Sequence, residues 1–183
     1  MGVHYVVEIL IVLITYSTVA VKPTAIPNWD DPTRQPMVKY AQLFNYGASA
    51  YVRITNKTID ATTHNKTDPD TYLQIDMFGP TLRAIRSYQT GEYICHNPTT
   101  GYPEMKVIVT VSKHPACMFY KTPNKKPYTS YRSRLNKKWY LAFHFKGNKA
   151  GRPKKGQRTS DFKNKGCMFL LDALKLSRKR RKG

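Results

Sequence analysis

Residues 128–134 read Tyr-Thr-Ser-Tyr-Arg-Ser-Arg, residues 139–143 read Trp-Tyr-Leu-Ala-Phe, and residues 151–159 read Gly-Arg-Pro-Lys-Lys-Gly-Gln-Arg-Thr. An apolar run, Cys167-Met-Phe-Leu170, closes this segment. The pattern predicts an aromatic strand, a loop that carries several cations, and a short closing strand. A basic loop braced by two strands would offer a cationic face to anions.

After residue 38, the rest of the chain shows a pattern typical of short strands separated by Gly, Pro and Asn. Apolar and polar residues alternate from Leu73 to Met77 and from Met105 to Val111. No long helical stripe is present, so we predict an all-β barrel or sandwich. The predicted strands span residues 38–44, 50–54, 72–77, 81–85, 93–95, 105–111, 116–120, 130–132, 139–143 and 166–170.

A weak internal repeat refines this prediction. Tyr51, Tyr93 and Tyr140 each precede an apolar residue in a predicted strand, at spacings of 42 and 47 residues. Three related units at this period indicate a threefold barrel. The 13 tyrosines of the chain also allow such a match by chance.

Positive charge is concentrated in the last third of the chain. Residues 121–183 hold 21 Lys and Arg against two acidic residues, whereas residues 1–120 hold 10 basic and 9 acidic residues. Because crowded like charges repel each other, this distribution predicts a polyanionic partner. Nucleic acid, an anionic membrane and a sulfated polysaccharide are the three possibilities.

The chain offers no pattern typical of a catalytic or metal site. Its three cysteines, Cys95, Cys117 and Cys167, cannot all pair within one chain, and their spacing fits neither zinc nor redox chemistry. We therefore predict small buried thiols. The five histidines lack metal-ligand spacing and no nucleophile has a recognisable setting, so we predict no enzyme activity, metal or cofactor.

The N-terminal residues indicate secretion. Residues 1–20 contain an apolar run that is too short to span a bilayer and end in small residues, which predicts a signal peptide cleaved after Ala20 and no membrane insertion. Glu8 interrupts the run and no Lys or Arg precedes it, which leaves a disordered or anchoring leader as the alternative. Residues 21–37 contain four prolines and predict an extended linker. Asn56 and Asn65 each begin an Asn-x-Thr sequon, a predicted glycosylation site that fits an extracellular chain.

From Cys117 onward the chain resembles the fibroblast growth factors. The motif Cys117-Met-Phe119 is followed by Tyr128 and by Tyr131-Arg-Ser-Arg134, and the segments 139–142 and 151–159 continue the match in order and spacing. The resemblance reaches from residue 38 to about residue 170. It implies a β-trefoil of twelve short strands with pseudo-threefold symmetry over residues 38–172, followed by a basic tail at 173–183. The Tyr-rich body looks most like the virus-encoded members carried by baculoviruses.

The resemblance also implies two binding surfaces. A receptor would contact apolar and aromatic side chains, although Phe44 and Leu170 would be assigned to the core from periodicity alone. Lys121 stands where the family has a receptor-contacting Glu, which implies a different receptor. The implied receptor-binding residues are Phe44, Tyr128, Thr129 and Leu170, and the implied heparin-binding residues are Lys149, Arg152, Lys154, Lys155, Arg158, Lys163, Asn164 and Lys165.

These features predict a secreted growth factor that binds heparan sulfate and activates a receptor tyrosine kinase of the fibroblast growth factor receptor type. A basic nucleic-acid-binding protein is the alternative from another class, and a cleaved signal peptide argues against it. Other secreted β-trefoils, such as lectins and protease inhibitors, share the architecture. The tail at 177–183 extends the polyanion site, forms a furin-like cleavage site, or acts as a nuclear localisation run.

Overall fold

A computed structural model describes residues 30–55, 58–144, 146–156 and 164–174. Several predicted features lie outside these residues: the signal peptide, residues 21–29 of the linker, the sequon asparagine Asn56, Arg158, Lys163, and the tail from residue 175.

The described residues form ten β-strands and five short 3-10 helices, with no α-helix among them. The strands are β1 (Met37–Asn45), β2 (Ala50–Ile54), β3 (Ile59–Thr63), β4 (Leu73–Phe78), β5 (Leu82–Ser87), β6 (Tyr93–His96), β7 (Pro103–Lys106), β8 (Phe119–Pro123), β9 (Thr129–Ser133) and β10 (Phe169–Ala173). The 3-10 helices are η1 (Pro69–Thr71), η2 (Val111–Lys113), η3 (Pro115–Cys117), η4 (Gly147–Lys149) and η5 (Lys165–Cys167).

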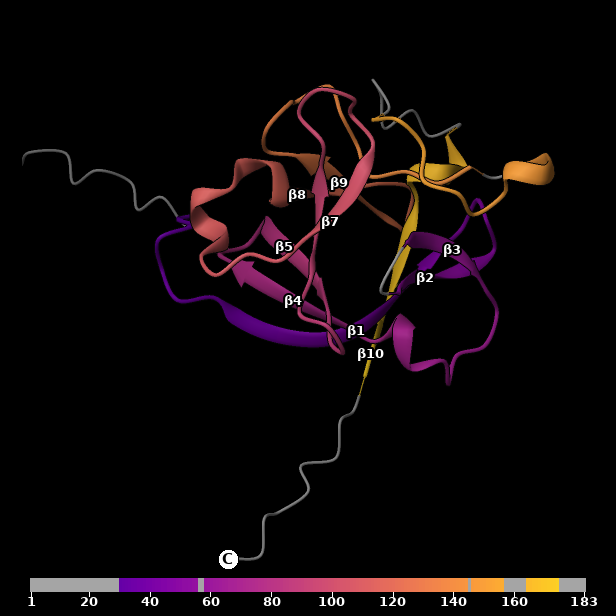
Figure 1. Ribbon diagram of the computed structural model, residues 1–183, viewed down its shortest axis with the longest axis horizontal. Coiled ribbons are helices and arrows are strands. Elements are labelled where there is room, and N and C mark those ends of the chain that lie inside the picture. The colour runs from indigo at the N-terminus through magenta and orange to yellow at the C-terminus, as the bar shows by residue number, and fades with distance from the viewer. Residues whose placement is uncertain (1–29, 56–57, 145, 157–163, 175–183) are drawn as a thin grey trace, which may run out of the picture.

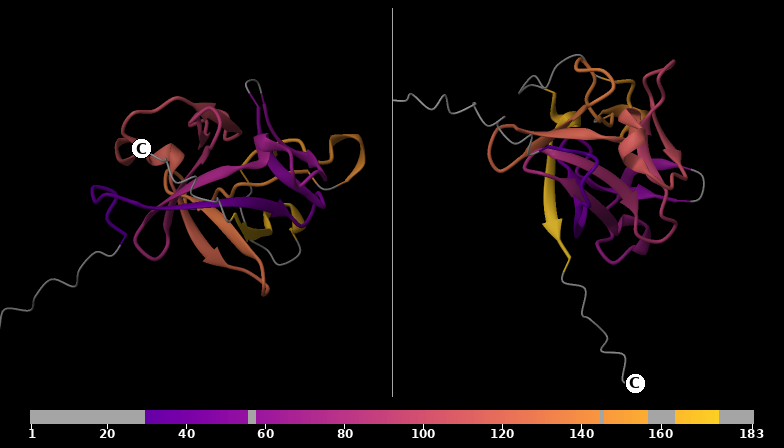
Figure 2. Two further views of the ribbon diagram at one scale, coloured as in Figure 1. Left: turned by 90° about the horizontal axis from the view of Figure 1, so that it is seen from below. Right: turned by 90° about the vertical axis from the view of Figure 1, so that its left-hand side faces the viewer.

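Six of the strands close into a barrel. Starting from β1, the order is β10, β9, β8, β5 and β4, and β4 pairs with β1 again, every pair being antiparallel. The hairpin β2–β3 continues from β1 and the hairpin β6–β7 continues from β5 (Figure 1). Figure 2 shows the long strand β1 crossing the body of the molecule. The prediction of an all-β fold is confirmed, and the arrangement is consistent with a β-trefoil; the described residues contain ten strands, so the predicted count of twelve is not confirmed.

Alternate residues of the strands fill the barrel because their side chains point inward and leave water. In β2, for example, Val52 and Ile54 are buried while Arg53 lies between them on the outer face. The main cluster comprises Ala41, Leu43, Val52, Ile54, Ile59, Ala61, Leu73, Ile75, Ile85, Ile94, Phe119, Tyr131, Leu141, Phe143 and Phe169.

Some predicted strands are wrong in their extent. The predicted strand 105–111 ends at Lys106, and Val107 and Val109 are 82% and 101% exposed, because no strand of the described residues pairs with them. Residues 139–143 form only isolated bridges, at Tyr140 and Phe143. The predicted strands 116–120 and 166–170 begin as the 3-10 turns η3 and η5 and become extended only later, and β3 was not predicted.

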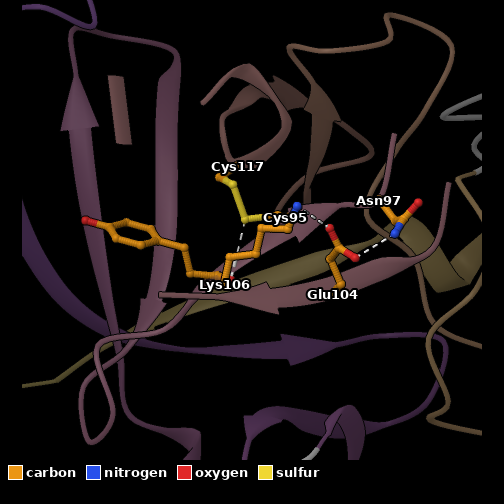
Figure 3. Close-up of a disulfide and its surroundings, with 6 residues drawn as sticks. Cys95, Asn97, Glu104, Lys106 and Cys117 are labelled. Atoms are coloured by element: carbon orange, nitrogen blue, oxygen red, sulfur yellow. Dashed lines mark hydrogen bonds and ion pairs between the residues drawn. A yellow bond between two sulfur atoms is a disulfide. The ribbon is translucent and has the colours of Figure 1, made fainter. Parts of the chain in front are cut away.

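The cysteine prediction is wrong for two of the three residues. Cys95 of β6 and Cys117 of η3 form a disulfide with an S–S distance of 2.05 Å (Figure 3). Their separation of 22 residues gave no indication that β6 and η3 would meet. A cross-link that closes a loop of this length stabilises a fold by about 3 kcal/mol, mainly by constraining the unfolded chain. Cys167 is a buried thiol, as predicted, and burial raises its pKa to about 12.

Candidate functional site

An outward-facing aromatic patch lies where β1, β2 and β10 run side by side. Phe44 of β1 is opposite Leu170 of β10 and opposite Tyr51 of β2, and the rings of Phe44 and Tyr51 meet edge to face at 5.3 Å. Directly opposite residues of antiparallel strands share one face of the sheet. Leu170 is 38% exposed and Phe44 is half-buried, so neither belongs to the core.

Tyr128 extends this patch from the residue before β9, and Thr129 begins that strand. Thr129 pairs with Phe169, and its hydroxyl donates a hydrogen bond of 3.4 Å to the Phe169 carbonyl oxygen. Because the two strands are antiparallel, Tyr128, the residue before β9, comes next to Leu170 of β10. The structure therefore brings Phe44, Tyr128 and Leu170 together, whereas Thr129 shares the inward face of the buried Phe169.

Tyr46 completes the aromatic patch and was missed by the sequence analysis. Its ring packs against that of Tyr128 with centroids 4.7 Å apart, and it is 37% exposed. It follows the last residue of β1, and its backbone N–H donates to the Met168 carbonyl oxygen at 2.9 Å. The only available signal was a tyrosine next to Gly47 at the end of a predicted strand. We use the name aromatic patch for Phe44, Tyr46, Tyr51, Tyr128 and Leu170.

Much of the predicted heparin site lies in a basic loop, residues 144–156. The loop leaves and rejoins the barrel at the Phe143–Pro153 bridge, and His144 exchanges backbone hydrogen bonds with Arg152 and Gly151 at 2.9 and 2.7 Å. The Gly151 carbonyl oxygen also accepts a hydrogen bond of 2.7 Å from the backbone N–H of Ala61. These contacts hold the base of the loop against β3 and leave its tip projecting into solvent.

The basic loop has a strongly positive local field. Lys149, Arg152 and Lys155 are exposed and Lys154 is half-buried. The pKa of His144 is lowered, first by burial and then by the charges of Lys154 and Lys149, so these three side chains lie close enough to interact. Within the described part of the chain, no ion pair involves Lys149, Arg152 or Lys154. These three cations are therefore not neutralised by a neighbouring carboxylate.

The turn at residues 164–167 carries the other described members of the predicted heparin site, Asn164 and Lys165. Its Gly166 carbonyl oxygen accepts hydrogen bonds from the Phe143 backbone N–H at 3.1 Å and from the Asn45 side-chain amide at 2.8 Å. A side chain at Gly166 would overlap the Phe143 carbonyl oxygen, so glycine permits this close approach. The turn and the basic loop consequently meet at Phe143.

The two candidate surfaces meet at Tyr46. The Lys165 ammonium nitrogen lies 5.7 Å from the centroid of the Tyr46 ring, a cation–π distance, and Tyr46 in turn packs on Tyr128. The 164–167 turn and the aromatic patch are therefore neighbours on one side of the molecule. Six of the eight predicted heparin-binding residues are described, and all six lie on the basic loop or on this turn.

The chain that carries these surfaces matches a known protein family. A model of the family described as fibroblast growth factor matches residues 39–170. The chain belongs to the fibroblast growth factor family. No curated protein matches the chain. The family match starts in β1 and ends in β10, so it spans both candidate surfaces of this fibroblast growth factor domain.

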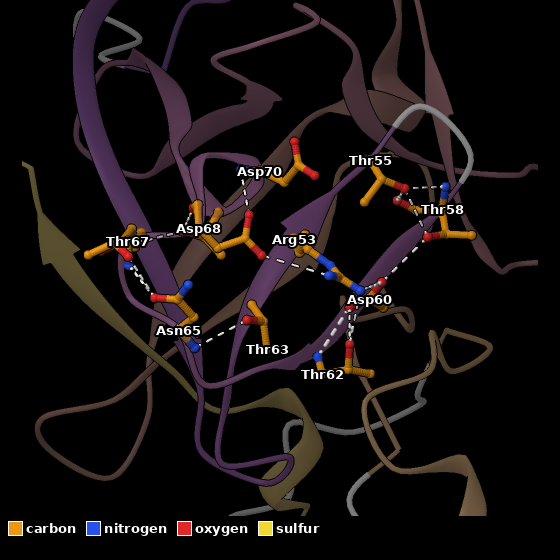
Figure 4. Close-up of polar contacts among 12 residues, drawn as sticks. Arg53, Thr55, Thr58, Asp60, Thr62, Thr63, Asn65, Thr67, Asp68 and Asp70 are labelled. Carbon is orange, nitrogen blue, oxygen red and sulfur yellow. Dashed lines mark hydrogen bonds and ion pairs between the residues drawn. The ribbon is translucent and has the colours of Figure 1, made fainter.

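The predicted glycosylation residue Asn65 is exposed in the loop that follows β3 (Figure 4). Its side-chain oxygen accepts hydrogen bonds from the Thr67 backbone N–H at 3.0 Å and from the Thr67 hydroxyl at 2.7 Å. Nearby, Arg53 bridges Asp60 at 3.1 Å and Asp68 at 3.7 Å, which ties the loop to the β2–β3 hairpin.

In the parts of the chain that the structure describes, no three His, Cys, Asp or Glu side chains gather into a possible metal site. Among the same residues, no helix has the length and apolar character needed to cross a membrane.

Proposed function

We propose that this member of the fibroblast growth factor family is a secreted growth factor with no catalytic activity of its own. It binds heparan sulfate through the basic loop and the 164–167 turn, and it binds a receptor tyrosine kinase of the fibroblast growth factor receptor type through the aromatic patch. Receptor activation then stimulates cell proliferation or migration. The observation that carries this proposal is the junction at Tyr46, where Lys165 and Tyr128 contact the same ring.

The composition of the aromatic patch supports a protein partner. Partly exposed Phe and Tyr side chains remove much apolar area from water on binding and lose few rotatable bonds, which makes them good interface anchors. Phe44 and Tyr51 already pack against each other, as do Tyr46 and Tyr128, so little order must be gained when a receptor docks.

The basic loop supports a sulfated polysaccharide as the second partner. Sulfates are bound by guanidinium and ammonium donors, and Lys149, Arg152 and Lys154 offer such donors without internal ion pairs in the described part of the chain. A polysaccharide held next to the aromatic patch can contact the receptor at the same time. Such bridging raises the effective concentration of the receptor and favours receptor dimerisation.

The proposal includes passage through the secretory pathway. The Cys95–Cys117 disulfide supports it, because disulfides form and persist in oxidising compartments. We propose cleavage after Ala20, glycans on Asn56 and Asn65, and a virus-encoded origin of the baculovirus type. Mass spectrometry of the chain from culture medium tests the processing steps: a mature N-terminus near Val21 is expected, and a retained Met1 would contradict secretion by this route.

Receptor phosphorylation in responsive cells tests the proposed function. Tyr128→Ala should reduce receptor binding roughly thirtyfold, the scale of a lost aromatic anchor of about 2 kcal/mol. Tyr88→Ala is the matched control, because Tyr88 is an exposed tyrosine that contacts Tyr40 instead of the aromatic patch. If Tyr128→Ala melts normally and activates the receptor at wild-type concentrations, the aromatic patch is not the receptor site.

A further inference from the structure

A cationic pocket lies beside Tyr128, on the side formed by the β8–β9 turn. It has a volume of about 380 Å³, and its walls include Pro80, Thr81, Lys121, Lys126 and Tyr128. We propose that this pocket receives the carboxylate of an acidic side chain on the receptor, held by the ammonium groups of Lys121 and Lys126. The inference rests on the proposed function and specifies the chemistry of the partner at this position.

The walls of the pocket are fixed by hydrogen bonds within the protein. The Lys121 backbone N–H donates to the Thr81 carbonyl oxygen at 2.8 Å, which joins β8 to the β4–β5 turn. The Thr81 hydroxyl and backbone N–H both donate to the Asp30 carboxylate. Asn124 donates from its side-chain amide to Ser130 at 2.7 Å and from its backbone N–H to the Tyr128 carbonyl oxygen at 3.1 Å.

Two wall groups keep their charge available for a ligand. Among the described residues, the ammonium groups of Lys121 and Lys126 take part in no ion pair. They stand on a preformed surface, so a bound carboxylate would need little rearrangement of the pocket.

A buried guanidinium adds to the positive field. Arg83 is 8% exposed, and it donates hydrogen bonds to the carbonyl oxygens of Gly79, Pro80 and Leu82 at 2.6–2.8 Å. Carbonyl dipoles solvate this cation but do not cancel its charge. The pKa of Lys121 is lowered by burial first and then by the charges of Arg83 and Lys39, which places three like charges near one another.

One acidic group opposes this field. Burial acts to raise the pKa of Asp30, but hydrogen bonds from Thr81 and Leu82 and the charge of Arg83 outweigh it and lower the pKa. Asp30 is thus ionised, and its carboxylate already accepts hydrogen bonds from Thr81 and Leu82. The charged groups around the pocket are then Lys39, Arg83, Lys121 and Lys126 against Asp30, and an incoming carboxylate would reduce this excess of positive charge.

The surroundings favour a peptide over a saccharide as the source of the anion. Pro80, Pro123 and Pro127 line the rim with apolar rings, which suit an extended peptide chain with apolar neighbours. Tyr128 also lines the pocket, so a receptor segment that covers the aromatic patch reaches it directly. The occupant to which we commit is an Asp or Glu side chain of the receptor ectodomain.

Charge reversal in the full-length chain tests this inference. Lys121→Glu is compared with Lys125→Glu, which makes the same change at an exposed lysine of the β8–β9 turn, outside the pocket walls. The probes are immobilised ectodomains of fibroblast growth factor receptors and, separately, immobilised heparin. The comparison uses the ectodomain that the wild-type chain binds. We expect Lys121→Glu to lower the affinity for this ectodomain by about tenfold or more, mainly through faster dissociation. Lys125→Glu should change the affinity by less than about threefold.

Complementary changes on the receptor give the decisive result. One Asp→Lys or Glu→Lys variant of the ectodomain should restore the affinity of the Lys121→Glu chain and not that of the Tyr128→Ala chain. Lys121→Met, which keeps the apolar stem without the charge, replaces Lys121→Glu if the latter does not fold. Equal affinities of Lys121→Glu and wild type would overturn the inference alone, and absence of ectodomain binding by wild type would overturn the proposed function with it. If Lys121→Glu lowers the salt needed for heparin elution more than Lys125→Glu does, the pocket binds sulfate and the inference is wrong.

Discussion

His96 should make the stability of the domain depend on pH. It lies in β6 with 0% exposure, between the rings of Phe119 and Trp139 at 5.4 and 5.8 Å. Among the described residues, no hydrogen bond of normal geometry reaches either ring nitrogen. Burial lowers its pKa to about 4, and the nearby backbone of Tyr140 offsets this in part. The imidazole is therefore neutral in the folded chain at pH 7, and it must gain a proton when the chain unfolds in mild acid.

The size of the effect follows from the two pKa values. In the unfolded chain the pKa of histidine is near 6.5, so unfolding takes up a proton between pH 6.5 and about 4. The stability that His96 contributes is complete above pH 6.5, decreases as the pH falls, and is lost below about 4. Between pH 7.5 and 5 the loss amounts to about 2 kcal/mol of unfolding free energy.

Urea unfolding at pH 7.5 and at pH 5 measures this loss in the parent chain and in His96→Leu. The variant should lose about 2 kcal/mol less than the parent over this range. The exposed His114→Gln serves as the control, and it should follow the parent. Carboxylates with a lowered pKa, such as Glu104, contribute mainly below this range.

An NMR titration of the His96 ring measures its pKa directly in the folded parent chain, so this test does not require that His96→Leu folds. Identical pH dependence in the parent and in His96→Leu would refute the reasoning, and so would a His96 ring that titrates near pH 6.5.

Further predictions concern the basic loop and the disulfide. Replacing Lys154 and Lys155 with Ala should lower the salt concentration at which the chain elutes from heparin, because each contacting cation displaces counterions from the polyanion. The same change at the exposed pair Lys137 and Lys138 should shift elution less, and equal shifts would show that heparin binding depends on total charge alone. Replacing Cys117 with Ser should lower the unfolding free energy by about 3 kcal/mol in a denaturant titration, and an unchanged midpoint would indicate that the Cys95–Cys117 link contributes nothing.

Strands that pair along their length could be predicted from the sequence. The alternation in β2 and β4 places Val52, Ile54, Leu73 and Ile75 inward, as the structure shows. The run 105–111 has the same alternation, but among the described residues no strand pairs with it after Lys106; Val107 and Val109 face water, and Val111 is buried at the start of η2. The alternation of apolar and polar residues is a property of one segment, whereas a strand also needs a neighbouring strand with which to form hydrogen bonds.

Other features depend on contacts between distant segments. Strand β3 was missed because only Ile59 and Ala61 of Ile59–Thr63 are buried, which is a weak signal among Asp and Thr. Tyr46 belongs to the aromatic patch because Lys165 of the 164–167 turn and Tyr128 pack against its ring, and these contacts join segments that are distant in the sequence. The predicted site residues could be located from motif spacing, but their junction could not.

Sedimentation velocity on a mixture of the chain, a receptor ectodomain and a heparin oligosaccharide tests the central proposal most directly. The account predicts a complex that contains all three components. Tyr128→Ala should remove the ectodomain from the complex and leave the oligosaccharide bound. The Lys154→Ala, Lys155→Ala double variant should weaken binding of the oligosaccharide more than binding of the ectodomain. A wild-type chain that sediments with heparin alone, whichever fibroblast growth factor receptor ectodomain is added, would contradict the account.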